Sequence, residues 1–226
     1  MSAGSSDGTH NVFENVRLVI WRHGQTDWNI ENRFQGHSDI PLNKVGHYQA
    51  SHAAKILAGM NPTRIFASDL IRAQETALKL GEIVRIEIET DPRLRETNGG
   101  NWEGRTGEEN RANDSARFTG WISGDDGPAG ETGERRSEVG IRAQAAALSA
   151  IDGARGTVVL VTHGGTARCL LGTLLKLDFS DWGSLGGLSN AQWSVVEFSK
   201  YLNRWTLSEH NAGSIPEPVF GNEEVN

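Results

Sequence analysis

Arg22 and His23 are the first residues of the chain whose types suit chemistry. They directly follow the apolar run 16–20, which predicts a short buried strand, and Gly24 then lets the backbone turn sharply. In an open α/β sheet, ligands bind at the carboxyl ends of the strands. A guanidinium beside an imidazole at such a place suits a tetrahedral oxyanion, because arginine presents a planar fork of donors. Taken alone, the pair is also compatible with a solvent-facing strand end.

A second histidine follows a second predicted strand. Residues 156–161 form the clearest central strand of the sequence, and they lead into His163, Gly164 and then a helix from Thr166 through Leu175. The glycine permits close backbone approach, and exposed N–H groups at the start of the helix favour an anion. Viewed alone, His163 is equally compatible with a satisfied structural histidine.

Two further charged residues lie near predicted strand ends. Arg72 falls in the first turn of a helix that follows the strand 63–67, with Ser68 or Asp69 as its N-cap. Without its neighbours it would be interpreted as a solvated helix arginine. Glu96 comes after the turn that follows the third predicted strand.

The elements that must position these residues alternate between strands and helices. Because no internal repeat is found, we expect one α/β domain at 15–212, between a disordered leader at 1–14 and a disordered tail at 213–226. The predicted elements are strands at 16–20, 63–67, 84–88 (an edge strand) and 156–161, helices after Asn43, after Ser68, at about 131–151 and after Gly165, and a closing hairpin-like pair at 190–198 and 204–207.

The segment 95–136 departs from this alternation. It holds nine of the 27 glycines of the chain, which makes it too glycine-rich for a packed core. Trp102, Phe118 and Trp121 nevertheless distinguish it from a free linker. We interpret it as an excursion with short helices that packs over the strand ends as a lid or substrate wall.

Composition excludes several classes of function. The net charge of −7 argues against a nucleic-acid partner and requires any anion site to be a local concentration of arginine and histidine. No apolar run reaches the roughly 18 residues of a membrane span. Residues 1–8 lack the positive region and apolar core of a signal peptide. The single Cys169 rules out an internal disulfide and favours a reducing compartment, so we expect a cytoplasmic protein with a small-molecule partner.

Four ordered motifs resemble the histidine phosphatase superfamily, the phosphoglycerate mutase-like enzymes. They span roughly Val16 to Asn211, and four motifs in order are far more specific than any one alone. The motifs are Arg22-His23-Gly24 with Thr26 and Asn29; Ser68-Asp69-Leu70 with Arg72-Ala73 and Glu75-Thr76-Ala77; Leu94-Arg95-Glu96 with Gly100, Trp102, Glu103 and Gly104; and Val161-Thr162-His163-Gly164-Gly165.

The resemblance implies a fold and a mechanism. The fold is a three-layer α/β/α sandwich around a mostly parallel mixed sheet, and the mechanism is covalent catalysis through a phosphohistidine. His23 is the implied nucleophile, and Glu96 the implied general acid that later activates water. The residues implied to hold the phosphate are Arg22, Asn29, Gln35, Arg72, His163 and Gly164.

Elementary chemistry agrees with these roles. Imidazole is nucleophilic only when neutral, so the pocket must orient His23 without protonating its attacking nitrogen. No metal or other cofactor is expected, because the arginines supply the positive charge and no cluster at metal-ligand spacing surrounds either histidine.

Two departures from the mutases of the superfamily favour water as the final acceptor. The mutases resemble one another in an Arg-His-Tyr-Gly-type run after the acid, whereas residues 97–104 here read Thr-Asn-Gly-Gly-Asn-Trp-Glu-Gly. Gly165 also stands where the mutases tend to carry asparagine. The sequence therefore favours a metal-independent phosphomonoesterase.

Substrate specificity is suggested by a narrower resemblance. Residues 94–97, 174–177, 185–191 and 211–212 are similar to the glucosyl-3-phosphoglycerate phosphatases of actinobacteria, in which a leucine at the position of Leu207 helps to line the sugar site. The alternatives are a broad-specificity phosphatase of small phosphate esters, a phosphoglycerate mutase and, last, a non-catalytic phosphate-binding module. The resemblance also favours a homodimer, as do the tryptophan-rich segments from Trp182 to Trp193, which we expect to lie at the surface.

Overall fold

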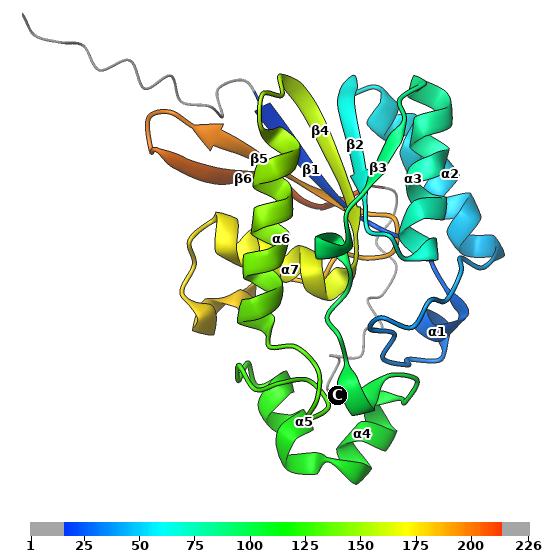
Figure 1. Cartoon of the computed structure of the whole chain (residues 1–226), viewed down its shortest axis with the longest axis vertical. Helices are drawn as coiled ribbons and strands as arrows, with labels where there is room; N and C mark the ends of the chain where they lie inside the picture. Colours follow the sequence, from blue (N-terminus) through cyan, green and yellow to red (C-terminus); the bar gives the residue numbers. More distant parts are fainter. Residues whose placement is uncertain (1–15, 214–226) are drawn as a thin grey trace, which may run out of the picture.

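The computed structural model describes residues 16–213, so the predicted leader and most of the predicted tail lie outside the described residues. The chain forms one six-stranded sheet in the order β3-β2-β4-β1-β5-β6 (Figure 1). The first four strands in that order are mutually parallel, and the last two run antiparallel to their neighbours. The strands are β1 (Val16–Arg22), β2 (Pro62–Ala67), β3 (Ile88–Thr90), β4 (Gly156–Thr162), β5 (Trp193–Ser199) and β6 (Arg204–Ala212).

Four longer helices cover the two faces of the sheet, two on each (Figure 1). They are α2 (Lys44–Ala58), α3 (Ile71–Val84), α6 (Arg136–Ile151) and α7 (Gly164–Leu174). Alternate residues of β1 point to opposite faces, as the period of a strand requires. Ile20 packs in one core cluster with α6 and α7, and Trp21 packs in a second cluster with α2 and α3. The fold is therefore the expected three-layer α/β/α sandwich.

The excursion after β3 forms a small lobe with its own core. It follows the 3₁₀ turn η1 (Pro92–Leu94) and contains a second 3₁₀ turn, η2 (Gly100–Trp102), and the helices α4 (Gly107–Asn113) and α5 (Ser115–Ile122). The predicted absence of a packed core here is wrong, because Trp102, Phe118, Trp121 and Ala129 are buried together with Phe34. The aromatic rings fill the space that the many glycines leave.

The start of α3 differs from the prediction. Neither Ser68 nor Asp69 caps this helix through its side chain. The N–H of Ile71 instead donates to the carboxylate of Asp39 at 2.7 Å, and the Asp69 carboxylate pairs with Arg95 at 2.6 Å. A cap from a residue 32 positions earlier in the chain leaves no local pattern in the sequence.

The third strand is also shorter and later than predicted. Residue Val84 ends α3, and Arg85 closes the helix in the left-handed conformation with a φ of 60°. The strand begins only at Ile88, and it is the edge strand that the mixed composition suggested.

The tryptophans expected at the surface are buried. Trp182 is 8% exposed and packs against Phe179 in the turn η3 (Phe179–Ser184), with ring centroids 4.9 Å apart. Trp193 is 3% exposed and belongs to the core on the α2 and α3 side. The surface argument for a homodimer is therefore wrong, and the homodimer remains a prediction from the resemblance alone.

Candidate active site

The strand register brings the two histidines together. β1 and β4 are adjacent parallel strands, and Arg22 lies opposite Thr162 in their pairing. His23 and His163 are thus the first residues beyond the two strands, and the N–H of His23 donates to the carbonyl of Thr162 at 3.0 Å. Their ring centroids lie 5.1 Å apart, and both side chains are buried.

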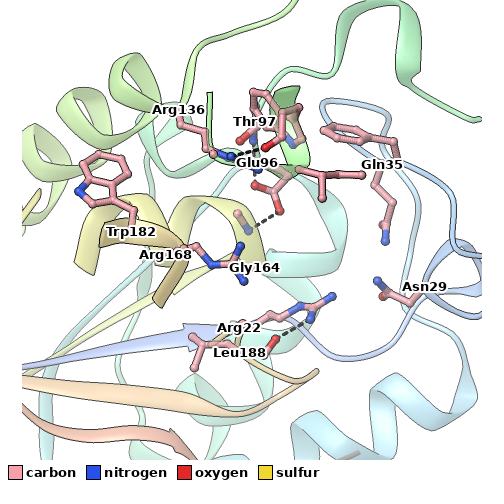
Figure 2. Close-up of a pocket in the computed structure, with 18 of the residues that line it drawn as sticks. Arg22, Asn29, Gln35, Glu96, Thr97, Arg136, Gly164, Arg168, Trp182 and Leu188 are labelled. Atoms are coloured by element: carbon pink, nitrogen blue, oxygen red, sulfur yellow. Dashed lines mark hydrogen bonds between the residues drawn. The ribbon is translucent and has the colours of Figure 1, made fainter. Parts of the chain in front are cut away.

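A pocket of about 380 Å³ opens beside this pair. Of the residues predicted for the site, Arg22, His23, Asn29, Gln35, Arg72, Glu96 and Gly164 line it, and Figure 2 shows how several of them approach one another. They come from the end of β1, from α1 (Asp27–Ile30) and the loop after it, from the start of α3, from the loop between η1 and η2, and from the start of α7. Residues spread over more than 140 positions of the sequence thus converge on one cavity.

His23 is held in the tautomer that a nucleophile needs. Its Nδ1 lies 2.6 Å from the carbonyl oxygen of Gly24. A carbonyl only accepts, so Nδ1 carries the proton and Nε2 carries the lone pair. Burial, followed by the nearby charges of Arg72 and Arg22, holds the pKa of His23 well below its ordinary value. The imidazole is therefore neutral at physiological pH.

His163 is held in the opposite tautomer. Its Nδ1 accepts a hydrogen bond from the Nε–H of Arg72 at 3.1 Å, so the ring proton sits on Nε2. This Nε2 is buried and has no hydrogen-bond partner among the described residues. Burial and the charge of Arg72 hold the pKa of His163 well below its ordinary value. His163 thus presents a neutral N–H donor that lacks an acceptor, which suits a bound oxyanion.

Arg72 is a buried cation with a fixed orientation. Besides His163, it donates to the carbonyls of Ser38 and Gly36, each at 2.8 Å. Burial lowers its pKa to about 10, so the guanidinium stays charged at neutral pH. The interpretation of Arg72 as a solvated helix arginine is excluded, because its side chain is fully buried.

The remaining phosphate candidates are oriented by backbone and amide contacts. Arg22 donates to the carbonyl of Leu188 at 2.5 Å. The side-chain oxygen of Asn29 accepts from the N–H of Thr26 at 3.0 Å and from the side-chain amide of Asn190 at 3.2 Å, which leaves its NH₂ group for a ligand. Gln35 is 7% exposed, and its Oε1 has no partner among the described residues.

The carboxylate of Glu96 rests on the amino end of α7. It accepts hydrogen bonds from the N–H of Thr97 at 2.8 Å, of Gly165 at 3.1 Å and of Thr166 at 3.0 Å. This contact draws the third and fourth motifs of the resemblance together, and it places the carboxylate beside Gly164 on the pocket wall (Figure 2).

The segment that carries Glu96 is clamped by Arg142 of α6. The guanidinium of Arg142 donates to the carbonyls of Arg93, Arg95 and Glu96 at 2.7, 2.7 and 2.9 Å. It also forms two hydrogen bonds with the carboxylate of Glu134, at 2.7 and 2.9 Å. Arg142 does not line the pocket, so its contacts identify it as a residue that positions Glu96.

Leu207 does not line the pocket. It lies on β6, the strand at the edge of the sheet, opposite Val196 of β5. Its half-buried side chain packs against the core cluster on the α6 and α7 side, so the predicted sugar contact is not made within this chain as the structure describes it. The leucine that does line the pocket is Leu188, from the loop before β5.

Several pocket residues were not predicted individually, although Trp121 belongs to the excursion that was interpreted as a lid or substrate wall. The aromatic side chains of Trp28, Phe34, Trp121, Phe179 and Trp182 line the cavity, and so do Arg136 and Arg168. Arg168 was predictable, because it lies in the first turn of the helix that was predicted to follow His163 and Gly164. Phe179 and Trp182 lie in an irregular segment without periodicity, and no local pattern indicates which way they point.

The described residues contain no group of three or more His, Cys, Asp or Glu side chains that could hold a metal ion. Within the same part of the chain, no helix is both long and apolar enough to cross a membrane.

Comparison with known proteins defines the class. Residues 18–212 match the model of the histidine phosphatase superfamily (branch 1), which is most of the chain. The chain therefore belongs to the histidine phosphatase superfamily, and it is a phosphatase-type hydrolase of that family.

Particular members are more similar still. The chain is 41% identical over 215 residues to a glucosyl-3-phosphoglycerate phosphatase of Mycobacterium tuberculosis, covering 88% of this chain and 95% of that protein. A solved structure of a mycobacterial glucosyl-3-phosphoglycerate phosphatase in complex with VO3 superposes with a TM-score of 0.81, at 38% identity over 87% of this chain and 99% of the other. A probable phosphoglycerate mutase of Yersinia enterocolitica is 37% identical, covering 72% of this chain and 76% of that protein.

Proposed function

We propose that this enzyme hydrolyses glucosyl-3-phosphoglycerate to glucosylglycerate and inorganic phosphate, through a phosphohistidine at His23. The main observation that supports this mechanism is that His23 and His163 adopt opposite tautomers. His23 has a lone pair on Nε2, whereas His163 has a proton on Nε2. One imidazole is thus ready to attack phosphorus, and the other is ready to bind an oxygen of the same phosphoryl group.

In the first half-reaction, Nε2 of His23 forms a bond to phosphorus while the ester P–O bond breaks. The guanidinium groups of Arg22 and Arg72 and the Nε2–H of His163 stabilise the charge on the non-bridging oxygens. Glu96, in its protonated form, gives its proton to the departing oxygen of the substrate. The alcohol then leaves, and the phosphoryl group stays on His23.

In the second half-reaction, water replaces the alcohol. Glu96, now ionised, accepts a proton as the water oxygen bonds to phosphorus and the N–P bond to His23 breaks. Inorganic phosphate leaves, and both residues return to their initial protonation states. The neutral imidazole of His23 is a good leaving group and nucleophile because burial beside two arginines disfavours its protonation.

Gly165 supports water, rather than a second sugar acid, as the acceptor. A Cβ atom at this position would lie 2.7 Å from Oε1 of Glu96. A longer side chain, such as the asparagine that the mutases tend to carry, would therefore push the carboxylate off the amino end of α7. With glycine, the carboxylate keeps its place at the wall of the pocket.

The activity of the relatives and the size and lining of the pocket support glucosyl-3-phosphoglycerate as the substrate. The mycobacterial relatives are glucosyl-3-phosphoglycerate phosphatases, and the similarity covers nearly their whole length. A volume of about 380 Å³ exceeds what a phosphate needs and leaves room for an organic group. The partly exposed aromatic ring of Trp28 provides a flat apolar surface of the kind on which a hexose ring stacks.

The test is a phosphate-release assay in the presence of EDTA. Glucosyl-3-phosphoglycerate, 3-phosphoglycerate, sugar phosphates and an aryl phosphate are compared by kcat/KM. We expect glucosyl-3-phosphoglycerate to exceed the others by at least about tenfold. Similar values for all esters would instead identify the broad-specificity phosphatase, and transfer between phosphoglycerates without phosphate release would identify a mutase.

A cytoplasmic location and a homodimer complete the proposal. The lone Cys169 is buried and suits a reducing compartment. The homodimer rests on the family resemblance and is checked by sedimentation of the purified chain.

A further inference from the structure

The pocket is strongly basic in a chain that is acidic overall. Its described lining contains five arginines, which are Arg22, Arg33, Arg72, Arg136 and Arg168, and a single carboxylate, Glu96. The whole chain has a formal net charge of −7. Arg33 is paired with Glu31 and Glu109, but the other four guanidinium groups still outnumber the one carboxylate of the lining, and this concentration of positive charge indicates a ligand with more negative charge than one phosphate.

The arginines fall into separate groups. Arg22 and Arg72 stand with the two histidines at the strand ends and match the dianionic phosphate. Arg33 is held by Glu31 at 2.5 Å and by the carbonyl of Gly104 at 2.7 Å. Arg136 and Arg168 lie on the wall formed by the starts of α6 and α7, and Figure 2 shows both guanidinium groups on that side of the cavity.

Arg136 is fixed by the excursion. Its guanidinium carbon lies 4.0 Å from the centre of a Trp121 ring, and Nη1 donates to the carbonyl of Trp121 at 2.7 Å. Arg136 is 8% exposed, and burying its charge to this extent costs free energy of folding. Stacking on an aromatic ring orients the planar guanidinium group, which keeps its positive charge.

Arg168 is fixed relative to the phosphate site by α7. It follows Gly164 by four residues, so both residues lie on the same face, separated by one helical turn of about 5.4 Å. The Gly164 backbone lies against Arg22, because a Cβ at 164 would be 3.4 Å from the guanidinium carbon of Arg22. Arg168 therefore stands about one helical turn from the predicted phosphate position.

We propose that Arg136 and Arg168 form a carboxylate subsite. They bind the acid group of a phosphate ester whose carboxylate lies a few bonds from the phosphorus, as it does in a 3-phosphoglycerate unit. Arginine suits this role because its fork matches a carboxylate in a two-point hydrogen bond. The inference rests on the proposed function, and it assigns the selection of acidic substrates to the α6 and α7 wall of the same site.

The test compares each acid substrate with its neutral amide. The ratio of kcat/KM for 3-phosphoglycerate, and for its glucosylated form, over the matching C1 amide is measured for the wild type and for Arg168→Gln. Losing hydrogen bonds to a charged group costs about tenfold to a hundredfold in affinity, so the wild type is expected to prefer the acid by this factor. In Arg168→Gln the preference falls to within about threefold.

Further variants separate binding from folding. Arg168→Lys keeps the charge but not the fork, and it is expected to give an intermediate ratio. Arg136→Gln tests the second arginine in the same way. If Arg136→Gln does not fold, the result for Arg168→Gln decides whether the carboxylate subsite exists. Arg117→Gln is the matched control: Arg117 of α5 pairs with Asp114 at the N-cap of that helix and does not line the pocket, so this variant keeps the wild-type ratio.

An aryl phosphate separates this proposal from the proposed function. Wild-type enzyme that hydrolyses the aryl phosphate, yet treats acid and amide alike, retains the phosphatase function and overturns the carboxylate subsite. The subsite is equally overturned if Arg168→Gln keeps the wild-type ratio. An enzyme that releases no phosphate from any ester overturns the proposed function instead.

Discussion

The Nε–H of Arg72 donates to Nδ1 of His163 over 3.1 Å, and both side chains are fully buried. This one hydrogen bond sets the tautomer of His163, because an arginine never accepts and the histidine nitrogen must therefore be unprotonated. The same guanidinium is fixed by the carbonyls of Ser38 and Gly36. Arg72 thus acts twice, as a cation near the predicted phosphate and as the residue that turns the second imidazole into a donor.

Arg72→Lys tests this double role. Lysine keeps a positive charge but has neither the Nε–H that meets His163 nor the planar fork. We expect kcat/KM to fall by about a hundredfold to a thousandfold, which corresponds to roughly 3–4 kcal/mol of lost transition-state stabilisation. Steady-state kinetics on an aryl phosphate measures the effect.

Arg64→Lys is the matched control for that variant. Arg64 also donates to backbone carbonyls, those of Ala150 and Asp152 at 3.1 and 2.9 Å, but near the start of β2, away from the pocket. Equal kcat/KM values for Arg72→Lys and Arg64→Lys would contradict a role for Arg72 in the reaction.

The two buried histidines predict a pH dependence of stability. Burial first, and then Arg72, holds the pKa of His23 and of His163 well below the ordinary value of 6.5. Below about pH 6.5 the unfolded chain takes up protons on these histidines while the native chain does not. The free energy of unfolding therefore decreases as the pH falls below 6.5, by up to about 1.4 kcal/mol per pH unit for each histidine.

Urea unfolding of the wild type and of His163→Asn between pH 7.5 and 5.5 checks this. The variant is expected to lose about half of the histidine-dependent slope. His52→Asn is the control, because His52 is exposed on α2, and it keeps the wild-type slope. Identical slopes for all three chains would show that His163 titrates alike in both states.

Glu96→Gln separates the two half-reactions. A sugar or glycerate alkoxide needs a proton to leave, whereas an acidic phenol does not. The variant should therefore be slow in forming the phosphoenzyme from an alkyl ester, but much less affected with an aryl ester. Because water activation still needs the carboxylate, rapid-quench kinetics on the aryl ester should show a burst of phenol followed by slow turnover. Equal slowing of phosphoenzyme formation from both esters would mean that Glu96 only shapes the site.

Arg142→Gln probes the positioning of Glu96. The variant removes five hydrogen bonds from the segment that carries Glu96 and from Glu134. We expect kcat on alkyl esters to fall by about tenfold to a hundredfold, with a smaller loss on aryl esters. Arg64→Gln, which loses comparable carbonyl contacts elsewhere, should affect both kinds of ester alike. The same loss on both esters in Arg142→Gln would indicate a purely structural residue.

Much of the fold was predictable because its signals are local. The β-branched runs of β1 and β4 predict buried strands, and the motifs at their ends mark the residues that the register then brings together. The helix predicted after Asn43 does begin there, because the Asn43 side chain accepts from the N–H of Gly46 and caps the helix within its own first turn.

What sequence reasoning missed depends on contacts between distant residues. The Asp39 cap of α3 and the Arg142 clamp on Glu96 join segments that no short pattern connects. Trp182 looked like a surface residue because it sits among glycine and serine, yet it fills a gap against α7 and lines the pocket. The role of Leu207 in lining the sugar site was inferred from the position that a leucine occupies in similar sequences. Such a position does not determine where the side chain packs.

Trapping the phosphoenzyme tests covalent catalysis by His23 directly. Wild-type enzyme is mixed with substrate labelled on phosphorus, quenched within a turnover, and mapped by mass spectrometry. We expect an acid-labile, base-stable phosphoryl group on His23 alone, and a loss of turnover of at least about a thousandfold in His23→Ala. A label on another residue, no label during rapid turnover, or full activity of His23→Ala would contradict covalent catalysis by His23.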